Sequence, residues 1–283
     1  MTDHPAPGLD HWIPSKAWGQ NYLVNAGVID KIVGLVPDEA AAVIEIGAGR
    51  GALTGALLAR GLRVLAVEPH EESARYLERA FGARAQFELR QADATSLDFA
   101  ALPGGSDPGF VPQGAPVVGN LPYCVAARIL FNLFRTARDR SPWILMFQRE
   151  VAQRIVAAPG SRDYGLLSVV SQLAARCQLR FQVQPGSFSP APKVMSAVVR
   201  FEPNAAPTTA GPPPDWDRLS AWLTRLFSQR RKQLGNSLSS LLPPDRLARL
   251  REDSTWSLKL RPEQLSPEDH LALFQTWGRD KMS

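Results

Sequence analysis

Residues 43–51, VIEIGAGRG, decide the fold of this chain. Branched apolar residues in a short run are typical of a buried strand of a parallel sheet. The glycines that follow allow a tight turn in which the backbone closely approaches a ligand. A helix expected to begin at about Ala52 offers free backbone amides at its N-terminus. The stretch therefore predicts a strand, a glycine turn and a helix that bind a nucleotide-like ligand.

The pattern around this stretch, from Ala26 to about Gln184, alternates short apolar runs with segments of helical period. Leu166, Val169, Val170 and Leu173, for example, share one helical face. This alternation predicts an α/β, Rossmann-like domain with a mostly parallel sheet. The strands are expected at 43–46, 64–67, 87–89, 117–118 and 144–147, with a late strand at 196–201.

A change of composition predicts a domain boundary. Residues 205–215 (AAPTTAGPPPD) have the composition of a linker, and a helical stripe that includes Leu219, Trp222 and Leu226 follows them. We therefore expect an α/β catalytic domain over 1–203, a linker over 204–215 and a small all-α domain over 216–283. A flexible surface loop is predicted at 103–114, PGGSDPGFVPQG.

The composition excludes several classes of protein. The 283 residues are 45% hydrophobic and 21% charged, which is typical of a globular chain. No apolar run reaches the roughly 18 residues of a membrane span, and the N-terminus lacks the layout of a secretory signal, so a cytoplasmic protein is expected. The two cysteines and four histidines show no ligand spacing, so no metal is expected.

The charge favours a nucleic-acid partner but does not establish one. The net charge is +5, and 26 of the 32 basic residues are arginine. Arginine binds phosphate bidentately, although a skewed genome composition produces the same excess. The five basic residues between Arg218 and Lys232 are a candidate RNA surface, and a solvated helix face is the alternative.

Two acidic residues follow the next two strands. Glu68 is placed where a carboxylate accepts both ribose hydroxyls, and Asp93 where it accepts from an adenine amine. Gly47, Gly49 and Ala52 also satisfy the looser dinucleotide pattern G-x-G-x-x-A, with Glu68 21 residues after Gly47. At this point an NAD enzyme remains an alternative.

Residues 119–123, GNLPY, separate these alternatives. An exocyclic adenine amine is a poor nucleophile because its lone pair is delocalised into the ring. The Asn120 oxygen and a carbonyl of the proline-stiffened turn can each accept one N–H of this amine, and Tyr123 can stack on the base. An ordinary asparagine-proline turn is the structural alternative.

Strings in a fixed order along the chain resemble the KsgA-type ribosomal RNA adenine dimethyltransferases, a family of class I S-adenosylmethionine-dependent enzymes. The resemblance covers nearly the whole chain from about Ala17. The strings are GQNYL (19–23), VID (28–30), EIGAGRGALT (45–54), VEP (67–69), QADA (91–94), GNLPY (119–123), QREV (148–151), PGS (159–161), YG (164–165), LSV (167–169), FSPAPKV (188–194), SAVVR (196–200), QRRK (229–232) and NSL (236–238).

The resemblance implies transfer of methyl groups from S-adenosylmethionine, with S-adenosylhomocysteine as product, to two adjacent adenines near the 3′ end of small-subunit rRNA. It implies a partner, the small-subunit rRNA or its precursor particle, and we expect a monomer with no obligate protein partner. The resemblance also implies roles for individual residues. The residues that would hold the cofactor are Asn21, Leu23, Gly47, Gly49, Gly51, Glu68, Asp93, Ala94 and Asn120. The target amine would be held by Asn120, Leu121, Pro122 and Tyr123, the base would stack on Tyr123 and Phe188, and the RNA would be bound by Arg225, Arg230, Arg231 and Lys232.

Some positions depart from the family pattern. Met195 stands where an aspartate is usual, Leu166 and Gly235 replace residues that are commonly basic, and Pro69-His70 follows Glu68 in place of a hydrophobic-aspartate pair. Two alternatives therefore remain open, namely an Erm-like enzyme acting on large-subunit rRNA and a catalytically idle ribosome assembly factor.

Overall fold

The structure is a computed structural model that describes residues 21–102, 110–204, 214–252 and 256–278. The chain forms two compact units. The first comprises Met1–Ala152 and Gln178–Pro203, and the second comprises Gln153–Cys177 and Asn204–Ser283. The second unit thus includes a segment, 153–177, that lies before the boundary expected at residue 203. The separate function of residues 216–283 as a domain stays a prediction.

The first unit is built on a seven-stranded sheet of order β4-β3-β2-β5-β6-β9-β7. The five strands from β4 to β6 are parallel, and β9 is antiparallel to β6. This sheet confirms the expected α/β, Rossmann-like fold. The strands are β2 (Ala42–Ile46), β3 (Arg63–Val67), β4 (Phe87–Arg90), β5 (Val117–Asn120), β6 (Trp143–Gln148), β7 (Ala175–Val183) and β9 (Ser196–Pro203).

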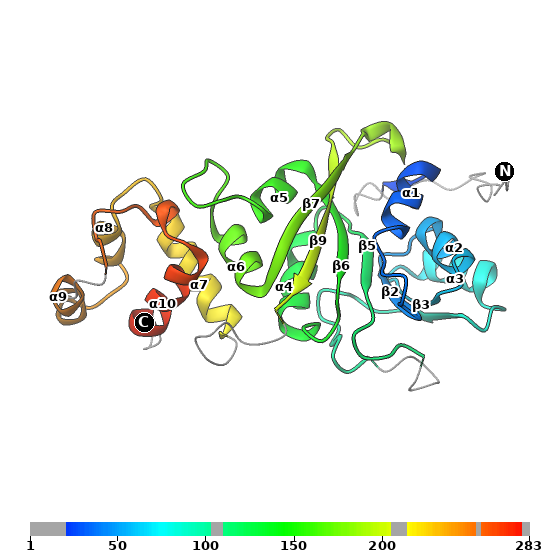
Figure 1. Cartoon of the computed structure of the whole chain (residues 1–283), viewed down its shortest axis with the longest axis horizontal. Coiled ribbons are helices and arrows are strands. Elements are labelled where there is room, and N and C mark those ends of the chain that lie inside the picture. The colour runs from blue at the N-terminus through cyan, green and yellow to red at the C-terminus, as the bar shows by residue number, and fades with distance from the viewer. Residues whose placement is uncertain (1–20, 103–109, 205–213, 253–255, 279–283) are drawn as a thin grey trace. The chain divides into compact units, whose positions relative to one another are not determined.

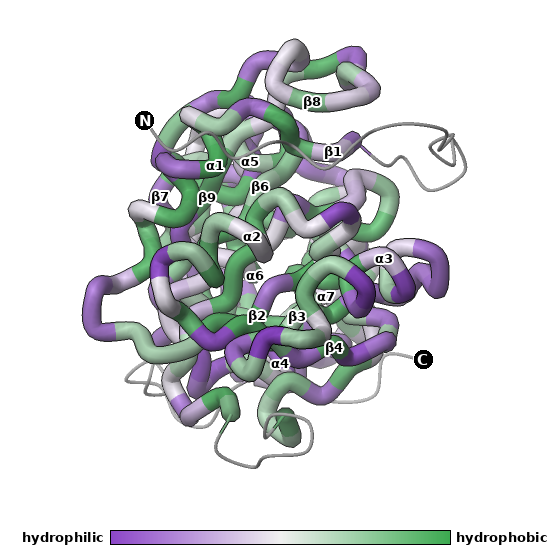
Figure 2. Tube along the Cα trace, turned by 90° about the vertical axis from the view of Figure 1, so that its right-hand side faces the viewer, coloured by the Kyte–Doolittle hydropathy of each residue, from purple (hydrophilic) through white to green (hydrophobic). Residues whose placement is uncertain are grey.

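The helices of the first unit follow the strands as expected for crossover connections. Figure 1 shows α1, α2 and α3 beside the β2 and β3 part of the sheet. In Figure 2 the tube of α3 is largely purple, because most of its residues are charged or polar. The helices are α1 (Ala26–Val33), α2 (Ala52–Ala59), α3 (Glu71–Phe81), α4 (Ala126–Thr136) and α5 (Arg149–Ile155), which crosses into the second unit.

The central strand β2 is buried over all five residues, as expected for a strand covered on both faces. Three strands were not predicted from the sequence. Strand β7 alternates apolar residues with arginine and glutamine (ARCQLRFQV), so it lacks the continuous apolar run of a strand that is buried on both faces. The two-residue strands β1 (Tyr22–Leu23) and β8 (Phe188–Ser189) pair antiparallel in a separate small sheet and are too short to give a period.

The second unit is helical. The stripe predicted after the linker forms α7 (Trp216–Ser228), and its Leu219, Trp222, Leu223 and Leu226 are fully buried. The other helices are α6 (Leu166–Ala174), α8 (Leu234–Leu238), α9 (Pro244–Glu252) and α10 (Pro267–Leu273), with a 3-10 turn at Pro262–Gln264 and a π-helical turn at Phe274–Gly278. Most of the predicted linker (205–213) and of the predicted loop (103–109) lies outside the described residues.

None of the helices in the described ranges is long and apolar enough to cross a membrane. Within the same ranges, no group of three or more histidine, cysteine, aspartate or glutamate side chains is arranged to hold a metal ion.

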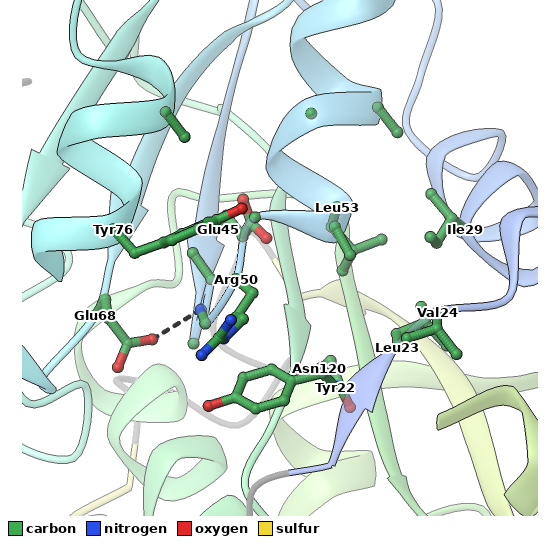
Figure 3. Close-up of a pocket in the computed structure, with 18 of the residues that line it drawn as sticks. Tyr22, Leu23, Val24, Ile29, Glu45, Arg50, Leu53, Glu68, Tyr76 and Asn120 are labelled. Carbon is green, nitrogen blue, oxygen red and sulfur yellow. Dashed lines mark hydrogen bonds between the residues drawn. The ribbon is translucent and has the colours of Figure 1, made fainter. Parts of the chain in front are cut away.

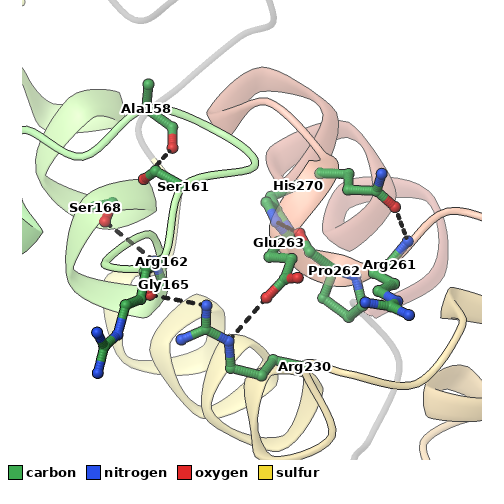
Figure 4. A network of polar contacts seen from close by, with 11 residues as sticks. Ala158, Ser161, Arg162, Gly165, Ser168, Arg230, Arg261, Pro262, Glu263 and His270 are labelled. Atoms are coloured by element: carbon green, nitrogen blue, oxygen red, sulfur yellow. Dashed lines mark hydrogen bonds and ion pairs between the residues drawn. The ribbon is translucent and has the colours of Figure 1, made fainter.

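A buried histidine lies in the core of the second unit. The Nε2 atom of His270 lies 2.9 Å from the carbonyl oxygen of Pro262, and since a carbonyl only accepts, Nε2 carries the proton (Figure 4). Its Nδ1 atom has no hydrogen-bond partner among the described residues. Burial lowers the pKa of His270 from 6.5 to about 4, although the Pro262 carbonyl and Asp269 oppose this shift. His270 is therefore neutral in the folded chain at pH 7.

This histidine predicts a loss of stability in mild acid. The unfolded chain binds a proton at His270 as the pH falls through 6.5, whereas the folded chain binds it only near pH 4. Between these values the free energy of unfolding is expected to fall, by roughly 3 kcal/mol at most. Urea unfolding at pH 7.5 and pH 5 should show a smaller difference for His270→Gln than for the parent chain. If both proteins lost the same stability between pH 7.5 and pH 5, His270 would not be the cause of the loss.

Candidate active site

The glycine turn and the GNLPY segment leave two neighbouring parallel strands at the same edge of the sheet. Ile46, the last residue of β2, pairs with Gly119, and Asn120 is the last residue of β5. The two turns also touch, since a Cβ atom on Gly47 would lie 3.6 Å from the Asn120 carbonyl oxygen. Beside them lies a cavity of about 570 Å³, which Figure 3 shows in close-up. The carboxyl edge of a parallel sheet is the usual ligand site in such folds.

Gly49 has no space for a side chain. Its φ is +55°, in the left-handed region, and a Cβ atom there would lie 2.9 Å from Cε1 of Tyr22. The turn therefore needs glycine both for its backbone conformation and for its contact with strand β1. As a result Tyr22 packs directly on the glycine turn and forms a wall of the cavity.

Glu68 lies at the end of β3 with its carboxylate in this cavity, 3% exposed. Oε2 accepts a hydrogen bond from the Gly49 N–H (2.9 Å, dashed in Figure 3), and Oε1 accepts one from the His70 N–H (3.0 Å). Burial raises the pKa of Glu68, and the two N–H donors oppose this shift. The bond to residue 70 comes from the backbone N–H and does not depend on the side chain there. The departure from the family pattern at Pro69-His70 therefore leaves the Glu68 carboxylate in position.

A second carboxylate, Glu45, lies beneath the turn. It is 1% exposed, and its Oε2 accepts a hydrogen bond from the Thr54 hydroxyl at 2.6 Å. Burial raises the pKa of Glu45 to about 7, and the nearby Glu68 adds to the shift, whereas the Thr54 bond opposes it. Glu45 thus ties the first turn of α2 to strand β2 and also contributes to the cavity lining.

Asn120 has its side chain fixed by the backbone of the N-terminal segment. Nδ2 donates a hydrogen bond to the carbonyl oxygen of Asn21 at 3.1 Å. This contact uses the amide nitrogen, so it leaves Oδ1 as the acceptor end of the side chain. Both residues line the cavity. The use of the Asn120 oxygen to accept an N–H of the substrate stays a prediction.

Tyr123 also lines the cavity, and its hydroxyl is 2.5 Å from the Ser196 hydroxyl at the start of β9. Burial raises the pKa of Tyr123, and the bond to Ser196 opposes the shift, so the phenol keeps its proton at neutral pH. Leu121 has a buried side chain, 1% exposed, and therefore offers the cavity mainly its backbone.

Three predicted residues lie away from the cavity lining. Asp93 is exposed, and its Oδ1 accepts the Thr95 N–H at 2.8 Å in a local turn; Ala94 is buried behind it. Phe188 is 4% exposed in the hydrophobic core, opposite Leu23 in the β1–β8 pair. Its stacking on a base stays a prediction.

The structure adds cavity residues that the sequence did not indicate. The Arg50 guanidinium lies over the rings of Tyr22 and Tyr76, 5.8 and 5.5 Å from the two ring centroids. All three line the cavity, where Figure 3 shows them. Tyr76 lies in the middle of a charged amphipathic helix, so its sequence context gave no signal. Tyr22 lies in the GQNYL string between Asn21 and Leu23, but only those two neighbours were expected to hold the cofactor.

The sequence as a whole matches the family described as "Ribosomal RNA adenine dimethylase" over residues 15–276. The chain belongs to this family. It is therefore an S-adenosylmethionine-dependent ribosomal RNA adenine dimethyltransferase, as its motifs predicted, and the NAD alternative is excluded.

Proteins named "Ribosomal RNA small subunit methyltransferase A" are similar to this chain over most of its length. The one from Pseudomonas savastanoi pv. phaseolicola is 39% identical over 88% of this chain and 89% of its own length, and the one from Acidobacterium capsulatum is 38% identical over 91% and 89%.

Two solved structures share the fold of this chain. A dimethyladenosine transferase from Plasmodium falciparum has a TM-score of 0.71 at 23% identity, covering 90% of this chain and 96% of that one. The 23S rRNA methyltransferase ErmE has a TM-score of 0.63 at 22% identity, covering 90% and 98%. At these identities the structures confirm the fold and do not separate the substrates.

The cavity of this family member fits an adenosyl cofactor. Its buried carboxylate, Glu68, faces the space left by the glycine turn, and carboxylates at this strand end accept ribose hydroxyls. Gly47, Gly49 and Gly51 line the cavity, so a ligand there meets the backbone at these three positions. We expect Asn21, Leu23, Gly47, Gly49, Gly51, Glu68 and Asn120, which all line the cavity, to hold it.

Gly119 supports the site from below and predicts a stability effect. A Cβ atom there would lie 2.9 Å from the Ile46 carbonyl oxygen and 2.9 Å from Cδ2 of Leu121. Gly119→Ala is expected to destabilise the chain by about 2 kcal/mol because strand β2 cannot move aside freely. Urea unfolding measures this effect. Gly186→Ala is the control, since nothing lies within 4 Å of its Cβ position. Equal stabilities of the two variants would contradict the prediction.

Four basic residues of the second unit were predicted to bind RNA. Arg225, Arg231 and Lys232 are exposed. Arg230 instead makes internal contacts: its Nε donates to Glu263 at 2.9 Å and its Nη2 to the Arg162 carbonyl at 2.9 Å (Figure 4). The guanidinium of Arg230 therefore joins the segment that follows helix α7 to the 3-10 turn and to the loop before α6.

Proposed function

We propose that the enzyme adds two methyl groups to N6 of each of two adjacent adenines near the 3′ end of small-subunit rRNA. The observation that carries the proposal is the Asn120 amide, anchored by the Asn21 carbonyl so that Oδ1 remains to accept from an amine. The identity of 39% with small-subunit methyltransferases over 89% of their length supports the choice of RNA.

The target amine is activated by hydrogen-bond acceptance. S-adenosylmethionine, when bound, supplies an electrophilic methyl group. Asn120 Oδ1 and the Leu121 carbonyl each accept one N–H, which favours a pyramidal nitrogen with a localised lone pair. Tyr123, a neutral phenol, stacks on the base. Pro122 stiffens the turn that carries these groups.

Positioning supplies most of the catalysis in this proposal. The donor is already activated, so the amine loses its proton only as it attacks or afterwards, and no general base is required. Holding the amine in line with the methyl group gains the entropic advantage of an intramolecular reaction. The short, internally bonded turns around Glu68 and Asn120 suit this role.

The second unit contributes to RNA binding through its exposed cations. Arg225, Arg231 and Lys232 are the proposed phosphate contacts, and we propose that residues 216–283 work as an RNA-binding domain. Arg230 contributes indirectly, since its ion pair with Glu263 holds the adjacent exposed residues in place. The enzyme would act in the cytoplasm on a precursor of the small subunit.

Labelled S-adenosylmethionine tests the proposal directly. The protein is incubated with undermethylated small subunits, with large-subunit rRNA and with DNA, and the labelled adenines are mapped. Label on two adjacent adenines near the 3′ end of small-subunit rRNA is expected. Label on large-subunit rRNA alone would assign an Erm-like activity instead. Binding of small subunits and cofactor without transfer would assign the role of an assembly factor.

A further inference from the structure

A buried serine lies behind the residue proposed to stack on the target adenine. Ser196 is the first residue of β9, is fully buried, and its hydroxyl lies 2.5 Å from the Tyr123 hydroxyl. The two residues are 73 positions apart in the chain. In the sheet order, strand β6 lies between β5, which leads into the Tyr123 turn, and β9. The contact therefore spans two strand spacings at the edge of the sheet where the cavity opens.

The bond controls the direction of the Tyr123 ring. The phenol oxygen lies on the symmetry axis of the ring, so holding this oxygen fixes where the axis points. Tyr123 is otherwise carried by a turn that follows β5, and it is only half-buried. Without a partner for its oxygen, the ring is free to change its χ1 rotamer. Ser196 is the rigid partner, because it pairs with Gln148 inside the sheet.

We propose that Ser196 is a positioning residue of the methyl-transfer site, which holds the Tyr123 ring in the orientation that stacks on the target adenine. The proposal rests on the proposed function, since it presupposes a base beside Tyr123. Ser196 does not itself line the cavity, so it acts through the tyrosine. A displacement of about 1 Å in a substrate-holding group can cost about a hundredfold in rate.

The first test observes the bond without RNA or cofactor. The chain has four tyrosines, so 3-fluorotyrosine labelling gives a simple 19F NMR spectrum. The resonance that disappears in Tyr123→Phe belongs to Tyr123. Ser196→Ala is expected to shift this resonance and to leave the other three in place. An unchanged Tyr123 resonance would overturn the proposal.

The second test measures transfer to undermethylated small subunits. Ser196→Ala and Tyr123→Phe are each expected to lower kcat by at least about tenfold, because both remove the same bond. The double variant Ser196→Ala/Tyr123→Phe should lose no more than either single variant. Ser196→Thr, which keeps the hydroxyl, should recover part of the loss. The affinity for S-adenosylhomocysteine, measured by calorimetry, should stay within about twofold.

Ser171→Ala is the matched control, because Ser171 is also fully buried but its hydroxyl has no hydrogen-bond partner among the described residues. It is expected to transfer methyl groups at the parent rate. A kcat for Ser196→Ala equal to that of Ser171→Ala would overturn the proposal, as would losses that multiply in the double variant. If the parent protein itself transfers nothing to small subunits, the proposed function fails, and the NMR result still shows whether Ser196 orients Tyr123.

Discussion

Replacing Asn120 by alanine is expected to lower methyl transfer by at least about a hundredfold, because the variant lacks the oxygen that accepts from the adenine amine. The Nδ2 contact to the Asn21 carbonyl fixes that oxygen in the present structure. Transfer is measured as label incorporated into undermethylated small subunits at saturating cofactor.

Two controls separate chemistry from folding in the Asn120→Ala variant. Its thermal unfolding temperature should stay close to that of the parent chain, since Asn120 is at the end of β5 and only partly buried. Its affinity for S-adenosylhomocysteine should change by less than about tenfold, the value of one neutral hydrogen bond. An Asn120→Ala enzyme with more than a tenth of the parent activity would show that another group holds the amine.

Replacing Glu68 by glutamine is expected to weaken the binding of S-adenosylhomocysteine by at least about a hundredfold. Two charge-assisted hydrogen bonds to the ribose are worth roughly 3–6 kcal/mol together. The substitution also places an amide donor where the Gly49 and His70 N–H groups now meet acceptor oxygens. Isothermal titration calorimetry measures the dissociation constant.

Glu72→Gln is the control for the Glu68 variant. It makes the same chemical change four residues later, at an exposed position in the first turn of α3. Its dissociation constant should lie within about twofold of the parent value. Binding by Glu68→Gln within threefold of the parent would mean that the ribose is held elsewhere in the cavity.

Much of the fold was predictable because its signals are local. Strands β2, β3, β5 and β6 contain short apolar runs, and α4, α6 and α7 carry apolar residues at helical spacing. Strand β7, at the edge of the sheet, was missed because its signal is an alternation of apolar and polar residues and not a continuous apolar run. The pair β1–β8 was missed because two residues carry no period.

The candidate site was predictable where motif residues end adjacent parallel strands. Gly47 and Glu68 directly follow β2 and β3, Asn120 ends β5, and all three line one cavity. Asp93, predicted from its place after the next strand, and Phe188, predicted from the family resemblance, lie outside the lining. Motif position thus identified the edge of the sheet correctly, but not the direction of every side chain at that edge.

The sequence by itself determined the strand, the glycine turn and the helix, because each is encoded by neighbouring residues whose periodicity or turn chemistry is local. The motifs in their fixed order also determined the family, and with it the cofactor class. Only the tertiary structure decided that the Asn21 carbonyl fixes Asn120, 99 residues away, that Ser196 holds Tyr123, and that Arg230 pairs with Glu263. Such contacts depend on how the sheet and helices pack, so no short stretch of sequence contains them.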